Sequence, residues 1–259
     1  MDYGVCNLTS VPIRKEESDK SEMVTQLLFG ETFQINLILG KWSQIIIDDD
    51  KYTGWIDNKQ YQLISAIVYN NLKKRVPLFV SDTLLPITEK NNCTFSIFRG
   101  STIYNSFGKR FMLGRSVFRS GRSTATPLPF EKKNKFIQIA NQYINTPYLW
   151  GGRSPFGIDC SGLVQISAKG AGLLLPRDAN QQVQIGKTIN LISEAQPGDL
   201  AFFDNQEGKI THVGIILDNA KIIHASGKVR IDTIDHQGIF NSQIRKYTHE
   251  LRIIKRIFN

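Results

Sequence analysis

The sequence has 259 residues, 41% of them hydrophobic and 21% charged, and its formal net charge is +9 at neutral pH. This length exceeds one typical domain of about 100–200 residues, so two or three modules are expected. Its basic residues are scattered and accompany no helix-turn-helix, zinc-finger or RNA-binding signature, so a nucleic-acid partner is not indicated. Its three cysteines suggest no disulfide framework, and no CxxC motif or histidine-rich run suggests a metal site.

The beginning of the chain, MDYGVCNLTSVPIRKEE, lacks the basic start and the uninterrupted apolar stretch of a secretory signal. No run approaches the ~20 apolar residues that span a bilayer. The sequence as written therefore predicts a cytoplasmic protein with no membrane partner, although removal of an export signal would leave the same pattern. The positive charge permits an anionic partner without implying one.

Residues 1–65 are predicted to form short strands packed into a small barrel. The strand-like stretches are VPIR, ETFQINLIL, WSQIIID and YTGWID, with turn residues between them, while SEMVTQLLFG fits a helix or a strand. Residues 66–125 repeat this texture in VPLFV, CTFSIF, STIYNSF and KRFMLG, which predicts a second small barrel.

Residues 126–259 are predicted to form a separate domain. The stretch RSTATPLPFEKK, with two prolines and small polar residues, is typical of a linker. After it, the apolar residues of NKFIQIANQYIN recur at helical spacing. A second helix is expected to start at Cys160 and to end near Gly170 and Gly172. The stretches GDLAFFD, THVGIIL, KIIHASG, KVRIDTID and HELRIIKRI then read as strands, so helices followed by antiparallel strands indicate an α+β fold.

Cys160 lies in the stretch YLWGGRSPFGIDCSGLV, after glycines and before an apolar helical run. A thiol at a helix N-terminus feels the positive end of the helix dipole, which favours the nucleophilic thiolate. Backbone N–H groups at the same helix start can hold a developing oxyanion. A lone cysteine before an apolar run is more often a buried small side chain, and that interpretation is preferred for Cys6 and Cys93.

Two of the four histidines favour catalysis at Cys160. His212 opens the strand HVGIIL and His224 lies in the following strand, and the turn Asp218-Asn219-Ala220 between them predicts a hairpin. His212 can then take the proton of Cys160 while His224 orients His212, which is the logic of a catalytic triad. The remaining two, His236 and His249, are interpreted as surface residues.

The ordered motifs YLWGGRSPFGIDCSGLV, QPGDLAFF, THVGIIL and IIHASG resemble those of the NlpC-type papain-like cell-wall peptidases over residues 130–259. The resemblance implies a papain-like domain in which Cys160, His212 and His224 form the triad and Tyr148 contributes to the oxyanion hole. It implies no metal or organic cofactor.

Residues SEMVTQLLFGE and YTGWI resemble the first of two bacterial SH3-like barrels that precede the peptidase in one subgroup, the γ-D-glutamyl-L-diamino acid endopeptidases. That subgroup cuts short peptidoglycan peptides with a free L-Ala amino end. The resemblance implies that Asp159 binds this ammonium group, helped by Glu22 and Tyr52. A carboxylate beside the nucleophile disfavours the thiolate unless it faces a cation, which agrees with such a role. Further substrate-binding candidates are Ser161, Arg177 and Asp178.

The expected function is therefore hydrolysis of the bond between γ-D-Glu and the diamino acid in peptidoglycan-derived peptides, in the context of muropeptide recycling. A wall-binding or wall-remodelling protein and a thiol acyltransferase that uses the same triad remain alternatives. The sequence indicates neither the preferred diamino acid nor the oligomeric state.

Overall fold

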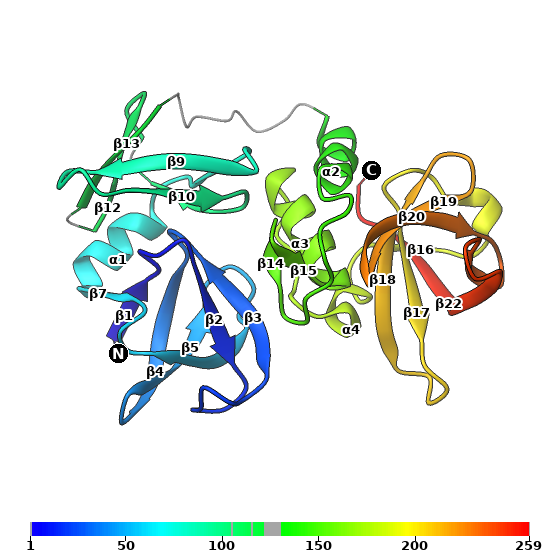
Figure 1. Cartoon of the computed structure of the whole chain (residues 1–259), viewed down its shortest axis with the longest axis horizontal. Helices are drawn as coiled ribbons and strands as arrows, with labels where there is room; N and C mark the ends of the chain where they lie inside the picture. Colours follow the sequence, from blue (N-terminus) through cyan, green and yellow to red (C-terminus); the bar gives the residue numbers. More distant parts are fainter. Residues whose placement is uncertain (1, 105, 115, 122–130, 259) are drawn as a thin grey trace. The chain divides into compact units, whose positions relative to one another are not determined.

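The computed structural model describes residues 2–104, 106–114, 116–121 and 131–258. The chain divides into two compact units, Met1–Pro127 and Leu128–Asn259 (Figure 1). The predicted boundary between residues 125 and 126, and most of the predicted linker, lie outside the described residues. Among the helices of the described ranges, none is long and apolar enough to cross a membrane.

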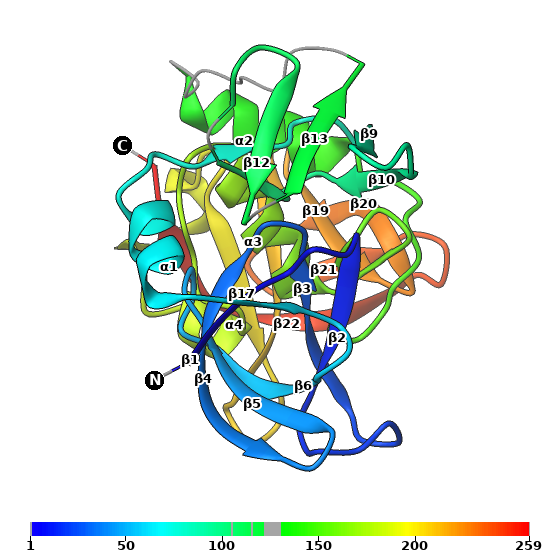
Figure 2. The same cartoon turned by 90° about the vertical axis from the view of Figure 1, so that its left-hand side faces the viewer.

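The first part of unit 1 is an antiparallel sheet in the order β3-β2-β6-β5-β4-β1-β7, seen from the side in Figure 2. Its strands are β1 (Asp2–Val5), β2 (Ser10–Arg14), β3 (Met23–Leu28), β4 (Thr32–Leu39), β5 (Trp42–Ile47), β6 (Thr53–Asp57) and β7 (Gln62–Ile64). The ambiguous stretch SEMVTQLLFG therefore contains a strand. Cys6 is fully buried in the core of this sheet, and burial raises the pKa of its thiol, which agrees with a structural role.

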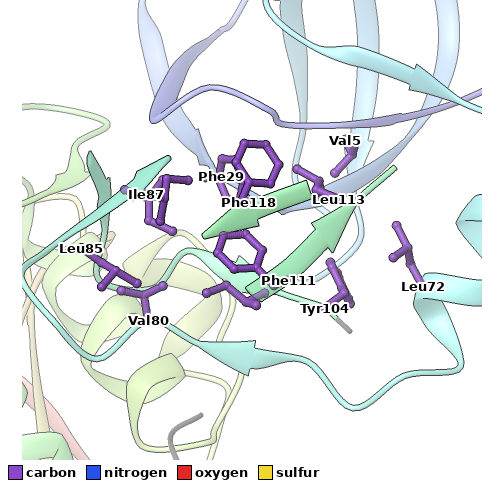
Figure 3. Packing of buried hydrophobic residues seen from close by; sticks show 12 residues of the cluster. Val5, Phe29, Leu72, Val80, Leu85, Ile87, Tyr104, Phe111, Leu113 and Phe118 are labelled. Carbon is purple, nitrogen blue, oxygen red and sulfur yellow. The ribbon is translucent and has the colours of Figure 1, made fainter. Parts of the chain in front are cut away.

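The second part of unit 1 begins with a helix that the sequence analysis missed. Its elements are α1 (Ala66–Lys73), β8 (Leu78–Phe79), β9 (Leu84–Glu89), β10 (Thr94–Phe98), β11 (Thr102–Ile103), β12 (Arg110–Leu113) and β13 (Ser116–Ser120). Val5 and Phe29 from the first part pack with side chains of the second in one core (Figure 3). The ring of Phe29 lies edge-on to that of Phe118, with centroids 5.3 Å apart. The two predicted barrels therefore share a hydrophobic core, and a second SH3-like barrel stays an interpretation.

Unit 2 places its helices before its main sheet, as predicted. Its elements are α2 (Lys132–Asn141), β14 (Arg153–Ser154), β15 (Gly157–Ile158), α3 (Cys160–Gly170), α4 (Ala179–Gln182), β16 (Lys187–Ile189), η1 (Ile192–Glu194), β17 (Leu200–Asp204), β18 (Ile210–Leu217), β19 (Lys221–Ser226), β20 (Lys228–Ile234), β21 (Gly238–Asn241) and β22 (Lys246–Arg256). The antiparallel order is β16-β22-β17-β18-β19-β20-β21, and β21 also pairs with β22. The predicted sheet thus closes into a barrel, which leaves strands β17–β22 without a free edge between them. Because strands dominate the whole chain, the α+β label stays an interpretation.

Helix α3 is buried on every side from Cys160 to Lys169. It starts where predicted because the side chain of its N-cap, Asp159, accepts a hydrogen bond from the backbone N–H of Gly162 at 2.7 Å. A Cβ atom at Gly162 would lie 2.4 Å from the carbonyl oxygen of Gly152, so only glycine permits this close approach of the preceding loop. The start of α3 is thereby held in one position.

Candidate active site

Cys160 is the first residue of α3, and its side chain is buried, with 6% of the residue exposed. A backbone hydrogen bond links its thiol to Val213 on β18. Since Val213 directly follows His212, the thiol lies beside the strand that carries the predicted base. The packing of α3 against β18 therefore brings the predicted nucleophile and base into one site.

The hairpin of β18 and β19 brings the two predicted histidines together. Gly214 pairs with His224, so His212, two residues before Gly214, projects from the same face of the sheet. Nε2 of His212 lies 2.9 Å from Nδ1 of His224. The turn between the strands has Asn219 and Ala220 in the left-handed region, which matches the primed turns of tight hairpins.

Asp232 on β20 extends this chain of side chains, and the sequence analysis missed it. Its Oδ2 lies 3.0 Å from Nε2 of His224, while Nε of Arg230 lies 2.7 Å from the same oxygen. In the register of β19 and β20, His224 pairs with Arg230, so Asp232 projects from the same face two residues further on. The sequence held a signal for this contact, because Asp232 lies in KVRIDTID, the strand predicted to follow the strand of His224. Neighbouring strands bring side chains on the same face close together.

His249 on β22 was interpreted as a surface residue, and this was wrong. Its ring stacks on that of His212, with centroids 4.1 Å apart and an angle of 24° between the planes. Burial and the charge of His224 lower the pKa of His249 to about 4. The position of His249 has a local cause. The pairing of β22 shifts register against both β17 and β21, and such bulges change the direction of side chains.

One ring nitrogen from each of His212, His224 and His249 lies within 4.8 Å of the other two. A metal ion needs nitrogen lone pairs, which lie in the ring planes, to converge on one point at about 2.0–2.1 Å. The stack of His212 on His249 keeps the two ring planes nearly parallel, so their lone pairs lie in separate planes, and Nε2 of His212 is already within hydrogen-bond distance of His224. This arrangement fits a packed histidine cluster better than a metal centre.

Burial governs the ionisation of the catalytic pair. It raises the pKa of Cys160 to about 12, with a further contribution from the negative charge of Asp159. Burial also lowers the pKa of His212 well below its ordinary value, as do the neighbouring His249 and His224. Burial therefore opposes the thiolate form that the positive end of the helix dipole favours.

Asp159 already has a cation, which is Arg177. The guanidinium donates two hydrogen bonds to the carboxylate, at 2.5 and 3.0 Å, and a third to Oγ of Ser161 at 2.8 Å. Asp159 also accepts hydrogen bonds from the backbone of Gly151 and Gly162. The cation that the sequence analysis required beside this carboxylate is thus supplied within the protein. Its role in binding an ammonium group stays a prediction.

Tyr148 lies near the start of α3. Burial, followed by the charges of Cys160 and Asp159, raises the pKa of its hydroxyl, which therefore remains a protonated hydrogen-bond donor across the neutral range. Its backbone N–H donates to the carbonyl of Gly227 at 3.0 Å. This position beside Cys160 is compatible with the predicted contribution to an oxyanion hole.

The remaining predicted residues are more widely distributed. Asp178 is the N-cap of α4 and follows Arg177 directly. Glu22 and Tyr52 belong to unit 1, where Glu22 forms an ion pair with Lys15 at 3.6 Å and Tyr52 packs against the barrel core. Their predicted contact with substrate stays a prediction.

The chain is similar in sequence and in structure to known proteins. The model of the NlpC/P60 family matches residues 145–248, the stretch that holds Tyr148, Cys160, His212 and His224. A model described as the bacterial dipeptidyl-peptidase Sh3 domain matches residues 13–60.

A gamma-D-glutamyl-L-lysine dipeptidyl-peptidase of Bacillus subtilis is 34% identical over 229 residues, which cover 78% of this chain and 71% of that protein. A protein of the same name from Bacillus cereus is 25% identical over 80% of this chain and 68% of its own length. A crystal structure of an NlpC/P60 family protein from Bacillus cereus superposes with a TM-score of 0.80 at 17% identity and covers 98% of this chain and 99% of that one. The fold of the whole chain thus has a solved counterpart.

Proposed function

Since the chain belongs to the NlpC/P60 family of cysteine peptidases, we propose that it hydrolyses the bond between γ-D-Glu and the diamino acid in short peptidoglycan-derived peptides. The observation that carries this proposal is the match over most of both chains to a gamma-D-glutamyl-L-lysine dipeptidyl-peptidase, together with the Cys160–His212–His224 site. A gamma-DL-glutamyl hydrolase of Bacillus subtilis, 30% identical over 67% of this chain and 44% of its own length, supports a γ-glutamyl bond as the target. Recycling of wall fragments is the context that suits a small peptide substrate.

In the proposed mechanism, the sulfur of Cys160 attacks the γ-carbonyl carbon of D-Glu while its proton passes to His212. The carbonyl oxygen becomes an oxyanion, and Tyr148 and backbone N–H groups at the start of α3 donate hydrogen bonds to it. The tetrahedral intermediate collapses when the C–N bond breaks and His212 returns the proton to the leaving amine. The diamino acid then departs, and a thioester links Cys160 to the rest of the peptide.

The second half of the reaction releases this acyl group. His212 takes a proton from water, the hydroxide attacks the thioester carbonyl, and the C–S bond breaks with return of the proton to sulfur. Burial favours the neutral form of His212, and a neutral His212 has a free lone pair with which to accept the proton. Burial of the site excludes bulk water, which strengthens each of these hydrogen bonds.

Recognition of a free L-Ala amino end is the finer part of the proposal. The carboxylate of Asp159 would accept a hydrogen bond from this ammonium group, and Ser161, Arg177 and Asp178 are further candidates for contacts with the substrate. Because Asp159 already accepts several hydrogen bonds, an incoming ammonium group would share a carboxylate that is held in place by Arg177.

A pair of peptides tests this specificity. L-Ala-γ-D-Glu-diaminopimelate is incubated with the protein, in parallel with the same peptide acetylated at its N-terminus, and the products are identified by mass spectrometry. We expect cleavage of the free peptide and a loss of at least about tenfold in kcat/KM for the acetylated one, since a buried carboxylate loses a charge-assisted hydrogen bond. Equal cleavage of both would discard the amine pocket and favour a wall-remodelling peptidase.

A further inference from the structure

We propose that Asp232 selects the tautomers of His224 and, through it, of His212, and so leaves Nδ1 of His212 as the catalytic base. Asp232 is buried at the end of the hydrogen-bonded chain that starts at His212, and it touches neither Cys160 nor the expected position of the substrate. It is therefore a positioning residue. The inference concerns the same site as the proposed function but does not depend on the identity of the peptide.

The chain of hydrogen bonds has one consistent direction. An ionised carboxylate only accepts hydrogen bonds, so Nε2 of His224, 3.0 Å from Oδ2 of Asp232, must carry a hydrogen. In a neutral imidazole the other nitrogen is then an acceptor, so Nδ1 of His224 accepts from Nε2–H of His212 across 2.9 Å. His212 consequently holds its hydrogen on Nε2, and its Nδ1 keeps the lone pair that can remove the proton of Cys160.

Arg230 holds the carboxylate of Asp232, at the end of this series of hydrogen bonds, in its ionised form. Its Nη2 donates to Oδ1 of Asp232 at 2.9 Å, while its Nε lies 2.7 Å from Oδ2. Burial acts to raise the pKa of Asp232, but hydrogen bonds from His224 and Arg230 outweigh it and hold that pKa below its ordinary value. The guanidinium also balances the charge of the carboxylate. A cationic His224 would donate from both nitrogens and force the hydrogen of His212 onto Nδ1.

Within the residues that the structure describes, the hydrogen-bond partner of Nε2 of His224 is Asp232. The ring of His249 stacks on His212 and lies at 84° to the ring of His224, and its own Nδ1 pairs with Oγ1 of Thr248 at 2.9 Å. Asp232 is thus the carboxylate that lies within hydrogen-bond distance of His224. Removal of this carboxylate therefore removes the group that fixes the tautomers.

The direct test is nitrogen-15 nuclear magnetic resonance of the histidine rings, whose nitrogen shifts distinguish the two tautomers. The chain has four histidines, and single His→Gln variants assign their signals. In the unchanged protein at neutral pH we expect both His212 and His224 to carry hydrogen on Nε2. In Asp232→Asn we expect the Nδ1–H tautomer of His212 to appear, because an amide NH₂ can donate to Nε2 of His224 and reverse the chain.

Kinetics supply the second readout. We expect Asp232→Asn to lower kcat roughly 100-fold with KM changed by less than about twofold. Loss of a carboxylate that is hydrogen-bonded directly to the catalytic histidine lowers kcat about 10⁴-fold, and Asp232 acts through one further ring. Alkylation of Cys160 by iodoacetamide, measured in a Cys93→Ser background, should slow in parallel without any peptide substrate. Asp235→Asn is the matched control, because Asp235 on the following turn binds the hydroxyl of Tyr247 instead of a histidine. Asp232→Glu should restore part of kcat.

Two results would overturn the inference. One is an Nδ1–H tautomer of His212 in the unchanged protein. The other is a folded Asp232→Asn variant with unchanged ring signals and full alkylation rate. Since tautomers and alkylation are measured without peptide, an inactive wild-type protein would count against the proposed substrate and leave this inference to be decided by these two readouts.

Discussion

Replacement of Cys160 by alanine is expected to abolish peptide hydrolysis, with a loss of at least about 10⁴-fold in kcat. The sulfur of Cys160 is the atom that forms the thioester, whereas the hydroxyl of its neighbour Ser161 is held by Arg177. Substrate binding should change little, because the side chain is small and buried. Initial rates with L-Ala-γ-D-Glu-L-Lys, and binding of the same peptide to the variant by calorimetry, measure the two effects separately.

Cys93 offers the matched control for this experiment. It is a free, exposed cysteine in unit 1, so the buried position expected for it from the sequence was wrong. Cys93→Ala therefore makes the same chemical change at a residue outside the catalytic site. That variant should retain full activity. Residual turnover of Cys160→Ala within about tenfold of the unchanged protein would require a different nucleophile and would remove the basis of the mechanism.

Replacement of Arg177 by methionine should cost about 3–5 kcal/mol of unfolding free energy, because it leaves the carboxylate of Asp159 buried without its cation. Both side chains are almost fully buried, so solvent cannot compensate for the lost charge. The start of α3 should also lose its fixed geometry, since Asp159 is the N-cap of that helix and Arg177 also holds Ser161. Urea denaturation followed by circular dichroism measures the change in stability.

The double variant Asp159→Asn/Arg177→Met separates the charge from the packing. With both charges gone, a substantial part of the lost stability should return, because the penalty of a single buried charge disappears. Lys209→Met serves as the control, since its ion pair with Glu207 is exposed and should contribute little. A loss for Arg177→Met as small as that of Lys209→Met would show that the buried pair does not hold the site together.

The parts of the site that lie close together in sequence could be predicted. Cys160 was found from its glycine-rich approach and the helical run after it, and α3 starts and ends near the predicted residues. The hairpin that carries His212 and His224 follows from two strands joined by one tight turn, because such strands pair with their neighbours in sequence. Local patterns of this kind determine both the element and the face on which the side chain lies.

The parts that depend on non-local pairing could not be predicted. His249 reaches His212 only because β22 returns to close the barrel beside β17, with two register shifts that change the direction of its side chains. The pair of Asp159 and Arg177 joins the cap of α3 to a loop 18 residues further on, and charge alone did not identify it. The shared core of unit 1 likewise brings Val5 and Phe29 against strands that follow α1, whereas hydrophobic patterns show only which faces are buried.

The most direct measurement follows the fate of one peptide in water labelled with oxygen-18. L-Ala-γ-D-Glu-L-Lys is incubated with the protein, and the masses of the products are measured by mass spectrometry. Hydrolysis of a thioester at the γ-carbonyl predicts free lysine and L-Ala-D-Glu with the heavy oxygen in its γ-carboxylate, and no such products with Cys160→Ala. Scission at the L-Ala–D-Glu bond, a new amide in place of the free carboxylate, or an intact peptide would each contradict a γ-D-glutamyl peptidase.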